Sequence, residues 1–257
     1  MENLTANPGS QDSAEGRLPQ RVPWTAVQGF GLLAIYILIQ AGILHLAWAW
    51  GMAERDLSFQ IGASNGLMLL AIYFILKGRA GGGSEASRAI AFRAPNLGDF
   101  RRLVKPVVLG AVAVFAALAV QNALSTYLRE SFGVKFPPQE VVARMRIMLN
   151  GGQWTELAIL AFLAVIVVPV AEELTFRGLL YLPLRSALGR VRGALIVSAI
   201  FSALHQHVEG LLPLFVLALV FTWMMEATGT ILAPILGHAF YNASMVALFL
   251  LTGGKVG

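Results

Sequence analysis

The amino-acid sequence predicts an all-α protein, a polytopic bundle of about seven to eight transmembrane helices. Of the 257 residues, 57% are hydrophobic and 13% are charged, whereas a soluble domain usually has about 25% charged residues. The mean hydropathy is +0.69. The apolar residues form continuous runs and do not alternate with polar ones, which argues against a β-barrel. We therefore expect an integral membrane protein of the helical class.

The predicted spans follow from apolar runs close to the ~20 residues that cross a bilayer. The long runs cover Trp24–Trp50, Leu57–Leu76, Val104–Leu124, Leu157–Val170 with the two glutamates that follow it, and Ile231–Leu251. Two shorter runs predict helices that their neighbours partly shield from lipid, and they cover Gly193–Leu204 and Leu211–Met225.

The chain divides into three parts. Residues 1–23 are polar and rich in Gly, Ser, Gln and Pro, which predicts a disordered cytoplasmic tail. Residues 24–150 hold the N-terminal transmembrane helices and an interfacial helix, whose start after Pro137 and Pro138 is typical of helix N-termini. Residues 151–257 form the candidate catalytic transmembrane core.

The distribution of basic residues predicts the orientation. With the N-terminus inside, the inner stretches hold two Lys or Arg residues in the tail, seven in residues 77–105 and four in residues 177–192, together 13 of the 19. Cytoplasmic segments carry such an excess, so we expect a cytoplasmic N-terminus, with the chain in a bacterial inner membrane. The net charge of +5 has the same origin. The lipid bilayer is thus an expected partner and nucleic acid is not.

Three charged residues follow the apolar run that ends at Val170, namely Glu172, Glu173 and Arg177. One ionised group at bilayer depth costs at least ~2.5 to 3.5 kcal/mol, so packing alone does not explain them. Glu173 and Arg177 are spaced i, i+4, share a helix face and can pair. Glu172 points about 100° away, so it remains available as a general base or acid. The alternative is a structural ion pair with a spare carboxylate at the interface.

Two histidines and an asparagine stand out in the apolar region that follows. If the helices around residue 191 form an antiparallel hairpin, Glu172 and His205 lie about 28 and 21 Å from its turn, which allows a Glu–His contact. His238 and Asn242 are again spaced i, i+4, and can form an oxyanion hole or a hydrogen bond between helices. His238 lies only about 12 Å from its own inner turn. The distances estimated for Glu172 and for His238 from their own turns can therefore both hold only if helices are broken or re-entrant.

These residues together resemble a known family. The motifs, in the family's order and spacing, are Glu172-Glu173-x-x-x-Arg177, Phe201-x-x-x-His205 and His238-x-x-x-Asn242. They are similar to those of the CAAX protease and bacteriocin-processing (CPBP) family, also called Abi or type II CAAX endopeptidases. The resemblance covers residues 172–242, and the first 150 residues carry no motif beyond being membrane helices.

The resemblance implies an intramembrane endopeptidase that hydrolyses a peptide bond near the membrane, in the C-terminal region of a membrane-associated protein or peptide. It implies that Glu172 and His205 bind and activate a water molecule. It assigns stabilisation of the tetrahedral oxyanion to the His238–Asn242 pair and support of the site to the Glu173–Arg177 pair. The resemblance points to chemistry without a metal or other cofactor.

Three alternatives stay open from the residues themselves. A metal-dependent version of the same peptidase could use Zn²⁺, because Glu and His are zinc ligands, although no His-Glu-x-x-His motif occurs and the absence of cysteine excludes thiolate ligands. A proton-coupled transporter would use buried Glu and His residues as a proton relay. A non-catalytic scaffold or immunity factor would tolerate the loss of Glu172 and His205.

Overall fold

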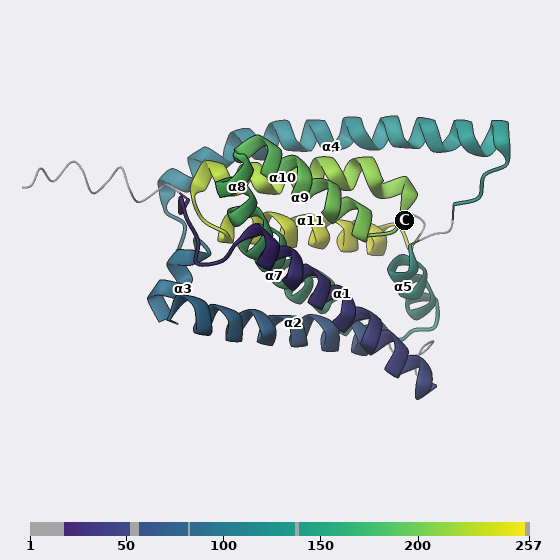
Figure 1. The fold of residues 1–257 in the computed structure, drawn as a ribbon. Helices are drawn as coiled ribbons and strands as arrows, with labels where there is room; N and C mark the ends of the chain where they lie inside the picture. The colour runs from purple at the N-terminus through teal and green to yellow at the C-terminus, as the bar shows by residue number, and fades with distance from the viewer. Residues whose placement is uncertain (1–17, 52–56, 82, 137–138, 255–257) are drawn as a thin grey trace, which may run out of the picture.

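The computed structural model describes residues 18–51, 57–81, 83–136 and 139–254, and these residues form a bundle of helices without a strand (Figure 1). Six helices within this part of the chain are long and apolar enough to cross a membrane, at Ala26–Ala49, Leu57–Ala80, Leu97–Phe132, Trp154–Leu188, Val208–Thr228 and Leu232–Leu251. This arrangement confirms the all-α, polytopic fold class, and the protein is an integral membrane protein. The division into three parts stays a prediction.

The first two spans are α1 (Ala26–Ala49) and α2 (Leu57–Ala80), which pack against each other. A capping box starts α1, in which the Thr25 hydroxyl accepts from Gln28 N–H and the Gln28 side chain accepts from Thr25 N–H. These bonds satisfy N–H groups that the first turn of a helix leaves without partners. A short helix, α3 (Gly83–Ala89), follows α2.

Helix α4 (Leu97–Phe132) is longer than the membrane is thick, and Figure 1 shows it along one edge of the bundle. Its 36 residues correspond to about 54 Å, so the predicted span Val104–Leu124 is only the part of α4 that a hydrocarbon core of ~30 Å covers. Gly133 ends the helix with φ 66°, a left-handed conformation that glycine adopts without steric cost. Helix α5 (Glu140–Asn150) lies at one end of the bundle, and its first residue agrees with the helix start predicted after Pro138.

A continuous helical segment over Trp154–Leu188 carries the glutamates. It consists of α6 (Trp154–Phe162), η2 (Leu163–Val167), α7 (Val168–Glu173), η3 (Leu174–Tyr181) and α8 (Leu182–Leu188), and η2 and η3 are π-helical. Each π stretch ends two residues before a proline, at Pro169 and Pro183. Because proline lacks an N–H and its ring crowds the preceding turn, a widened turn is a way to keep the helix continuous.

The predicted hairpin is present. Gly189, at φ 85°, joins α8 to α9 (Arg190–Leu204), and a Cβ on Gly193 would lie 3.1 Å from the backbone nitrogen of Arg185, so the two helices pack closely there. The remaining elements are η4 (Val208–Gly210), a 3₁₀ turn, then α10 (Leu211–Thr228) and α11 (Leu232–Leu251).

The chain before α1 differs from the expected disordered tail. Residues 1–17 of that prediction lie outside the described residues. Leu18 and Trp24 are buried in the main hydrophobic core. The Trp24 indole N–H donates to the carbonyl of Leu179 at 3.1 Å, and the Ser186 hydroxyl donates to the carbonyl of Gln20 at 2.8 Å. Apolar side chains at positions 18, 22 and 24 explain the difference, because they give this polar stretch a face to bury.

Candidate active site

A chain of four ionisable side chains lies inside the bundle where α7, η3 and α11 meet. Glu173 Oε1 accepts from Arg177 Nη1 at 2.9 Å, and it lies 2.9 Å from His238 Nδ1. His238 Nε2 in turn lies 3.8 Å from Glu172 Oε2. The order Arg177–Glu173–His238–Glu172 therefore links three of the predicted site residues of one helical segment to a histidine 65 residues further along the chain.

The ion pair between Glu173 and Arg177, expected from the i, i+4 spacing, is completely buried, since both side chains are 0% exposed. Arg177 Nη2 also donates to the carbonyl of Ala218 at 2.9 Å. The guanidinium lies over the rings of Phe201 and Phe221, 5.1 and 5.5 Å from their centroids. A buried charge is tolerated when it is paired and hydrogen-bonded, and cation–π contacts add to this when water is excluded.

The imidazole of His238 is held between the two glutamates. With Nδ1–H donating to Glu173, Nε2 faces Glu172 across 3.8 Å, which is too long for a hydrogen bond. The ring stacks on Phe221 with centroids 4.9 Å apart and an interplanar angle of 23°. These contacts orient the imidazole, so that its second nitrogen points to the less constrained carboxylate.

Glu172 differs from Glu173 in its surroundings. Its side chain keeps 14% exposure, and its Oε2 is buried with no hydrogen-bond partner among the described residues. A buried polar atom without a partner costs free energy unless water or a ligand reaches it. Glu173 Oε2 also has no partner among the described residues, but Glu173 is 0% exposed and its other oxygen is held by Arg177 and His238, so Glu172 is the more accessible of the two carboxylates.

His205 and Asn242 are placed differently from the other candidates. His205 follows the last residue of α9 and is exposed, and its Nδ1 lies 2.7 Å from the carbonyl of Phe201. No contact with either glutamate is present for it within the described ranges. The Phe201 ring connects it to the site, with centroids 4.5 Å from His205 and 6.1 Å from His238.

The side chain of Asn242 forms a hydrogen bond with the backbone of the π-helix η2. Its Nδ2 donates to the carbonyl of Ala164 at 2.8 Å. In η2 the N–H of Val168 bonds the carbonyl of Leu163, so the next bond of this series would join residue 169 to Ala164. Residue 169 is a proline and has no N–H, and the asparagine amide takes its place. Of the six predicted site residues, the structure therefore brings four into contact, with His205 and Asn242 beside them.

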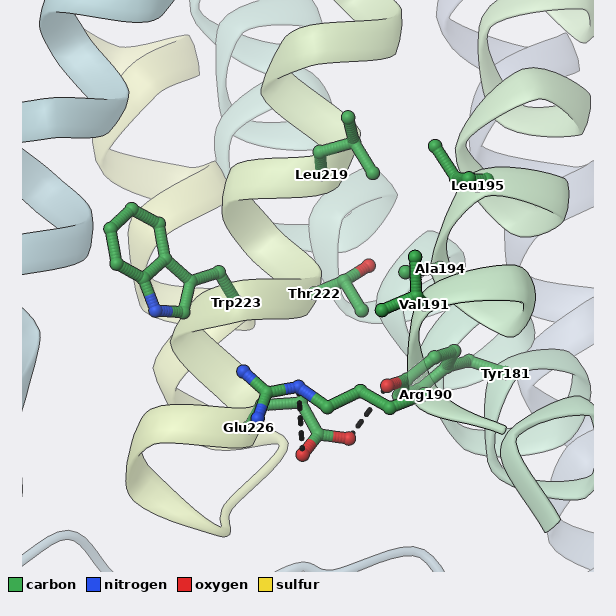
Figure 2. Close-up of a pocket in the computed structure, with 9 residues that line it drawn as sticks. All are labelled: Tyr181, Arg190, Val191, Ala194, Leu195, Leu219, Thr222, Trp223 and Glu226. Carbon is green, nitrogen blue, oxygen red and sulfur yellow. Dashed lines mark hydrogen bonds and ion pairs between the residues drawn. The ribbon is translucent and has the colours of Figure 1, made fainter.

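A second charged cluster explains how His238 reaches the glutamates despite the conflicting registers. Glu226 Oε1 accepts from the Tyr181 hydroxyl and from Arg185 Nε, each at 2.6 Å, and Glu226 Oε2 lies 3.6 Å from Arg190 Nε. Figure 2 shows Tyr181 and Arg190 converging on Glu226, beside a pocket between α9 and α10. Glu226 thus brings Tyr181, Arg185 and Arg190 together near one end of α10.

Tyr181, Arg185 and Arg190 all lie at about the position of Glu226 along the bundle axis. Helix α8 therefore does not carry the chain much further along that axis. Glu173 precedes Tyr181 by eight residues, and His238 lies six residues after the start of α11 at Leu232. Both distances are therefore similar, about 12 and 9 Å. The distance of the glutamates along the bundle should therefore be counted from the position of Glu226 and not from the turn after residue 188.

A polar group on α1 and α2 was not predicted from the sequence. The Tyr36 hydroxyl donates to Asn65 Oδ1 at 3.3 Å and accepts from Gln40 Nε2 at 3.0 Å. Tyr36 and Gln40 are spaced i, i+4 in an apolar run, which is the same signal that drew attention to His238 and Asn242. In the part of the chain that the structure describes, no three His, Asp or Glu side chains are placed to hold a metal ion.

Comparison with family models finds a match to the type II CAAX prenyl endopeptidase Rce1-like family over residues 154–244. Comparisons with curated proteins and with solved structures find no significant match. The matched segment contains all six candidate residues and every helix from α6 to α10, together with the first two-thirds of α11. Residues 154–244 are therefore an Rce1-like endopeptidase domain of the CAAX protease family, and the protein is a membrane-embedded peptide hydrolase.

Proposed function

We propose that this endopeptidase hydrolyses its substrate with a water molecule activated by Glu172. The observation that carries the proposal is the contrast within the glutamate pair. Glu173 is 0% exposed and is bound through Oε1 by Arg177 and His238, whereas Glu172 keeps 14% exposure and its Oε2 has no hydrogen-bond partner among the described residues. Glu173 Oε2 also lacks a partner there, but this side chain is closed off from solvent. A general base needs a free lone pair within reach of the proton that it takes.

The reaction then balances without a covalent enzyme intermediate. Glu172 takes one proton from water while the water oxygen attacks the scissile carbonyl carbon, and the carbonyl oxygen becomes an oxyanion. Collapse of this tetrahedral species re-forms the carbonyl and breaks the C–N bond. The proton held by Glu172 passes to the leaving nitrogen, which gives a new carboxyl end and a new amine.

The neighbouring side chains suit supporting roles. Glu173, fixed by Arg177, accepts from His238 Nδ1–H and so keeps Nε2 directed at the reaction space. His205 Nδ1 is hydrogen-bonded to the carbonyl of Phe201, so its Nε2 is available to accept a hydrogen bond from the attacking water. For Asn242, the second N–H of its amide is the one available to an oxyanion, since the first holds Ala164.

We further propose that the substrate is a membrane-associated protein or peptide cut in its C-terminal region, and that the chain sits in a bacterial inner membrane with its N-terminus in the cytoplasm. The excess of Lys and Arg in residues 77–105 and 185–192 supports this orientation. Partly exposed Arg185 and Arg190 lie at the Glu226 end of α10, at the face that this orientation places inside.

The test compares new protein termini in membranes by mass spectrometry. Cells would carry the wild type, Glu172→Gln, or Glu156→Gln, a matched change at an exposed position of the same helical segment. We expect the same set of cleaved membrane proteins with wild type and Glu156→Gln, and loss of that set with Glu172→Gln. An unchanged set with Glu172→Gln, at equal protein levels, would refute the role of Glu172.

Chelation separates the metal-free mechanism from a zinc-dependent one. Purified protein in lipid vesicles would be treated with a strong chelator and assayed for cleavage of a substrate found in the preceding experiment. Metal-free chemistry predicts unchanged activity. Complete loss that added Zn²⁺ restores would show that the glutamates and histidines bind a metal that activates the water.

A further inference from the structure

The proposed reaction needs hydrogen-bond donors for the oxyanion, and the two side chains assigned to this task are largely engaged. His238 directs Nδ1–H to Glu173, and Asn242 uses one amide N–H on Ala164. An oxyanion hole usually supplies donors 2.7–3.1 Å from the developing charge. A further donor can come from the helices that pack against this segment from outside residues 154–244.

The packing of α1 places Tyr36 opposite Glu172. The contacts run antiparallel, since Gln20 bonds Ser186 and Trp24 bonds Leu179. At Gly29 the backbones touch, because a Cβ there would lie 2.7 Å from the carbonyl oxygen of Leu179. Tyr36 lies seven residues after Gly29, and Glu172 lies seven residues before Leu179, about 10 Å in each case.

Two further observations agree with this register. Tyr36 belongs to a hydrophobic cluster against which Val170 and Leu174 pack, two residues before and two after Glu172. Helix α2, which carries Asn65, also packs against α7. The tyrosine is 7% exposed, so its hydroxyl lies inside the bundle and not among the lipids. Polar groups in such a place usually have a functional role.

The hydroxyl of Tyr36 is held in a way that lets its proton move to another acceptor. It accepts a bond of 3.0 Å from Gln40, whereas its own bond to Asn65 is long, at 3.3 Å. For O–H···O the common distance is ~2.7–2.8 Å, so the donated bond is weak. Asn65 keeps its other bond, from Nδ2 to the carbonyl of Ile61 at 2.9 Å. Turning the proton away from Asn65 thus breaks one weak bond and leaves the ring in place.

We propose that the Tyr36 hydroxyl donates a hydrogen bond to the carbonyl oxygen of the scissile bond as it becomes an oxyanion. This inference rests on the proposed function, in which Glu172 activates the attacking water. Glu172 and Tyr36 would then lie on opposite walls of the reaction space, one taking a proton from the nucleophile and the other stabilising the negative charge. Helices α1 and α2 thereby complete an active site that the family match alone does not contain.

The test measures transition-state binding with Tyr36→Phe, which removes only the hydroxyl. The substrate is a synthetic peptide that spans a junction cleaved by the wild type, and the inhibitor is its phosphinate analogue, a tetrahedral anion in place of the scissile amide. We expect kcat and phosphinate affinity each to fall by about 10²-fold or more, with KM within about twofold of wild type. Tyr73→Phe, at an exposed position on α2, should change neither.

The outcomes separate this inference from the function on which it rests. Activity and phosphinate affinity of Tyr36→Phe within about twofold of wild type, with Glu172→Gln inactive, would overturn the role of Tyr36 alone. A loss confined to KM would also overturn it, because a transition-state donor acts on kcat. Cleavage retained by Glu172→Gln would instead refute the proposed function.

If Tyr36→Phe does not fold, replacing Tyr36 by 3-fluorotyrosine keeps the side-chain shape and makes the hydroxyl a stronger donor. We expect kcat and phosphinate affinity to change together by the same factor. No change in either quantity would overturn the proposal.

Discussion

Two charged clusters of the catalytic segment contain the same kinds of side chain in different surroundings. The inner cluster of Glu173, Arg177 and His238 lies inside the bundle, with the ion pair 0% exposed. The end cluster of Glu226, Tyr181, Arg185 and Arg190 lies where α10 ends, with Glu226 7% and Arg190 60% exposed. In the proposed mechanism the inner cluster positions the base, whereas the end cluster holds α8, α9 and α10 together near the end of α10.

This difference in exposure decides what each interaction contributes. Inside the bundle, no water replaces a lost partner, so removing one charge leaves the other buried and unpaired. At the end of α10, solvent can hydrate the exposed arginine, and such pairs contribute little. The same substitution should therefore have a large effect in the inner cluster and smaller effects in the end cluster.

The largest effect on stability is expected for Glu173→Gln. It leaves the Arg177 guanidinium buried without its counter-ion, a change that costs about 3 to 5 kcal/mol in buried ion pairs. Thermal unfolding in detergent micelles or vesicles would measure the loss against wild type. A variant as stable as wild type would show that the pair does not hold the segment together.

The control for that prediction removes both charges. In Glu173→Leu with Arg177→Met, no unpaired charge remains, and apolar replacement of a buried pair is often neutral or stabilising. We expect the stability to return close to that of wild type while cleavage stays lost, because His238 then has no carboxylate to orient it. Recovered cleavage would mean that the inner cluster is structural only.

A smaller effect is expected in the end cluster for Glu226→Gln. Tyr181 and Arg185 both donate to this carboxylate, and glutamine keeps a carbonyl oxygen that can accept from one of them. The expected loss is therefore that of about one hydrogen bond to a charged group, ~1.5 to 3 kcal/mol. The matched change Arg190→Gln, at the exposed member, should cost less than about 1 kcal/mol. Unfolding of the two variants side by side measures the difference, and equal losses would contradict the comparison.

The spacing of residues along one helix predicted much of the candidate site. The position of each residue along the bundle axis could not be predicted from this spacing. The spacing of Glu173 and Arg177 gave the correct ion pair, because i, i+4 residues share a face of an α-helix or a π-helix turn next to it. The hairpin that was assumed around residue 191 is present, with its turn at Gly189. Both inferences use only neighbours along one helix or across one turn.

Other features depend on contacts that no local pattern reveals. The π-helices shift side chains relative to a regular helix, and Asn242 bonds Ala164 because Pro169 lacks an N–H. Arg177 was counted with the cytoplasmic residues, although it is buried. The i, i+4 spacing from Glu173 does not indicate how deep in the membrane the pair lies. Tyr36 escaped notice because its partner Asn65 lies on another helix, outside any motif.

The most direct measurement is the cleavage rate of Glu172→Gln in lipid vesicles, with Glu156→Gln as the matched control and unfolding temperatures recorded for both. General-base catalysis contributes about 10²- to 10⁴-fold, so activation of water by Glu172 predicts a loss of at least about 100-fold in the first variant, with wild-type stability, and no loss in the control. A rate for Glu172→Gln close to that of wild type would contradict it.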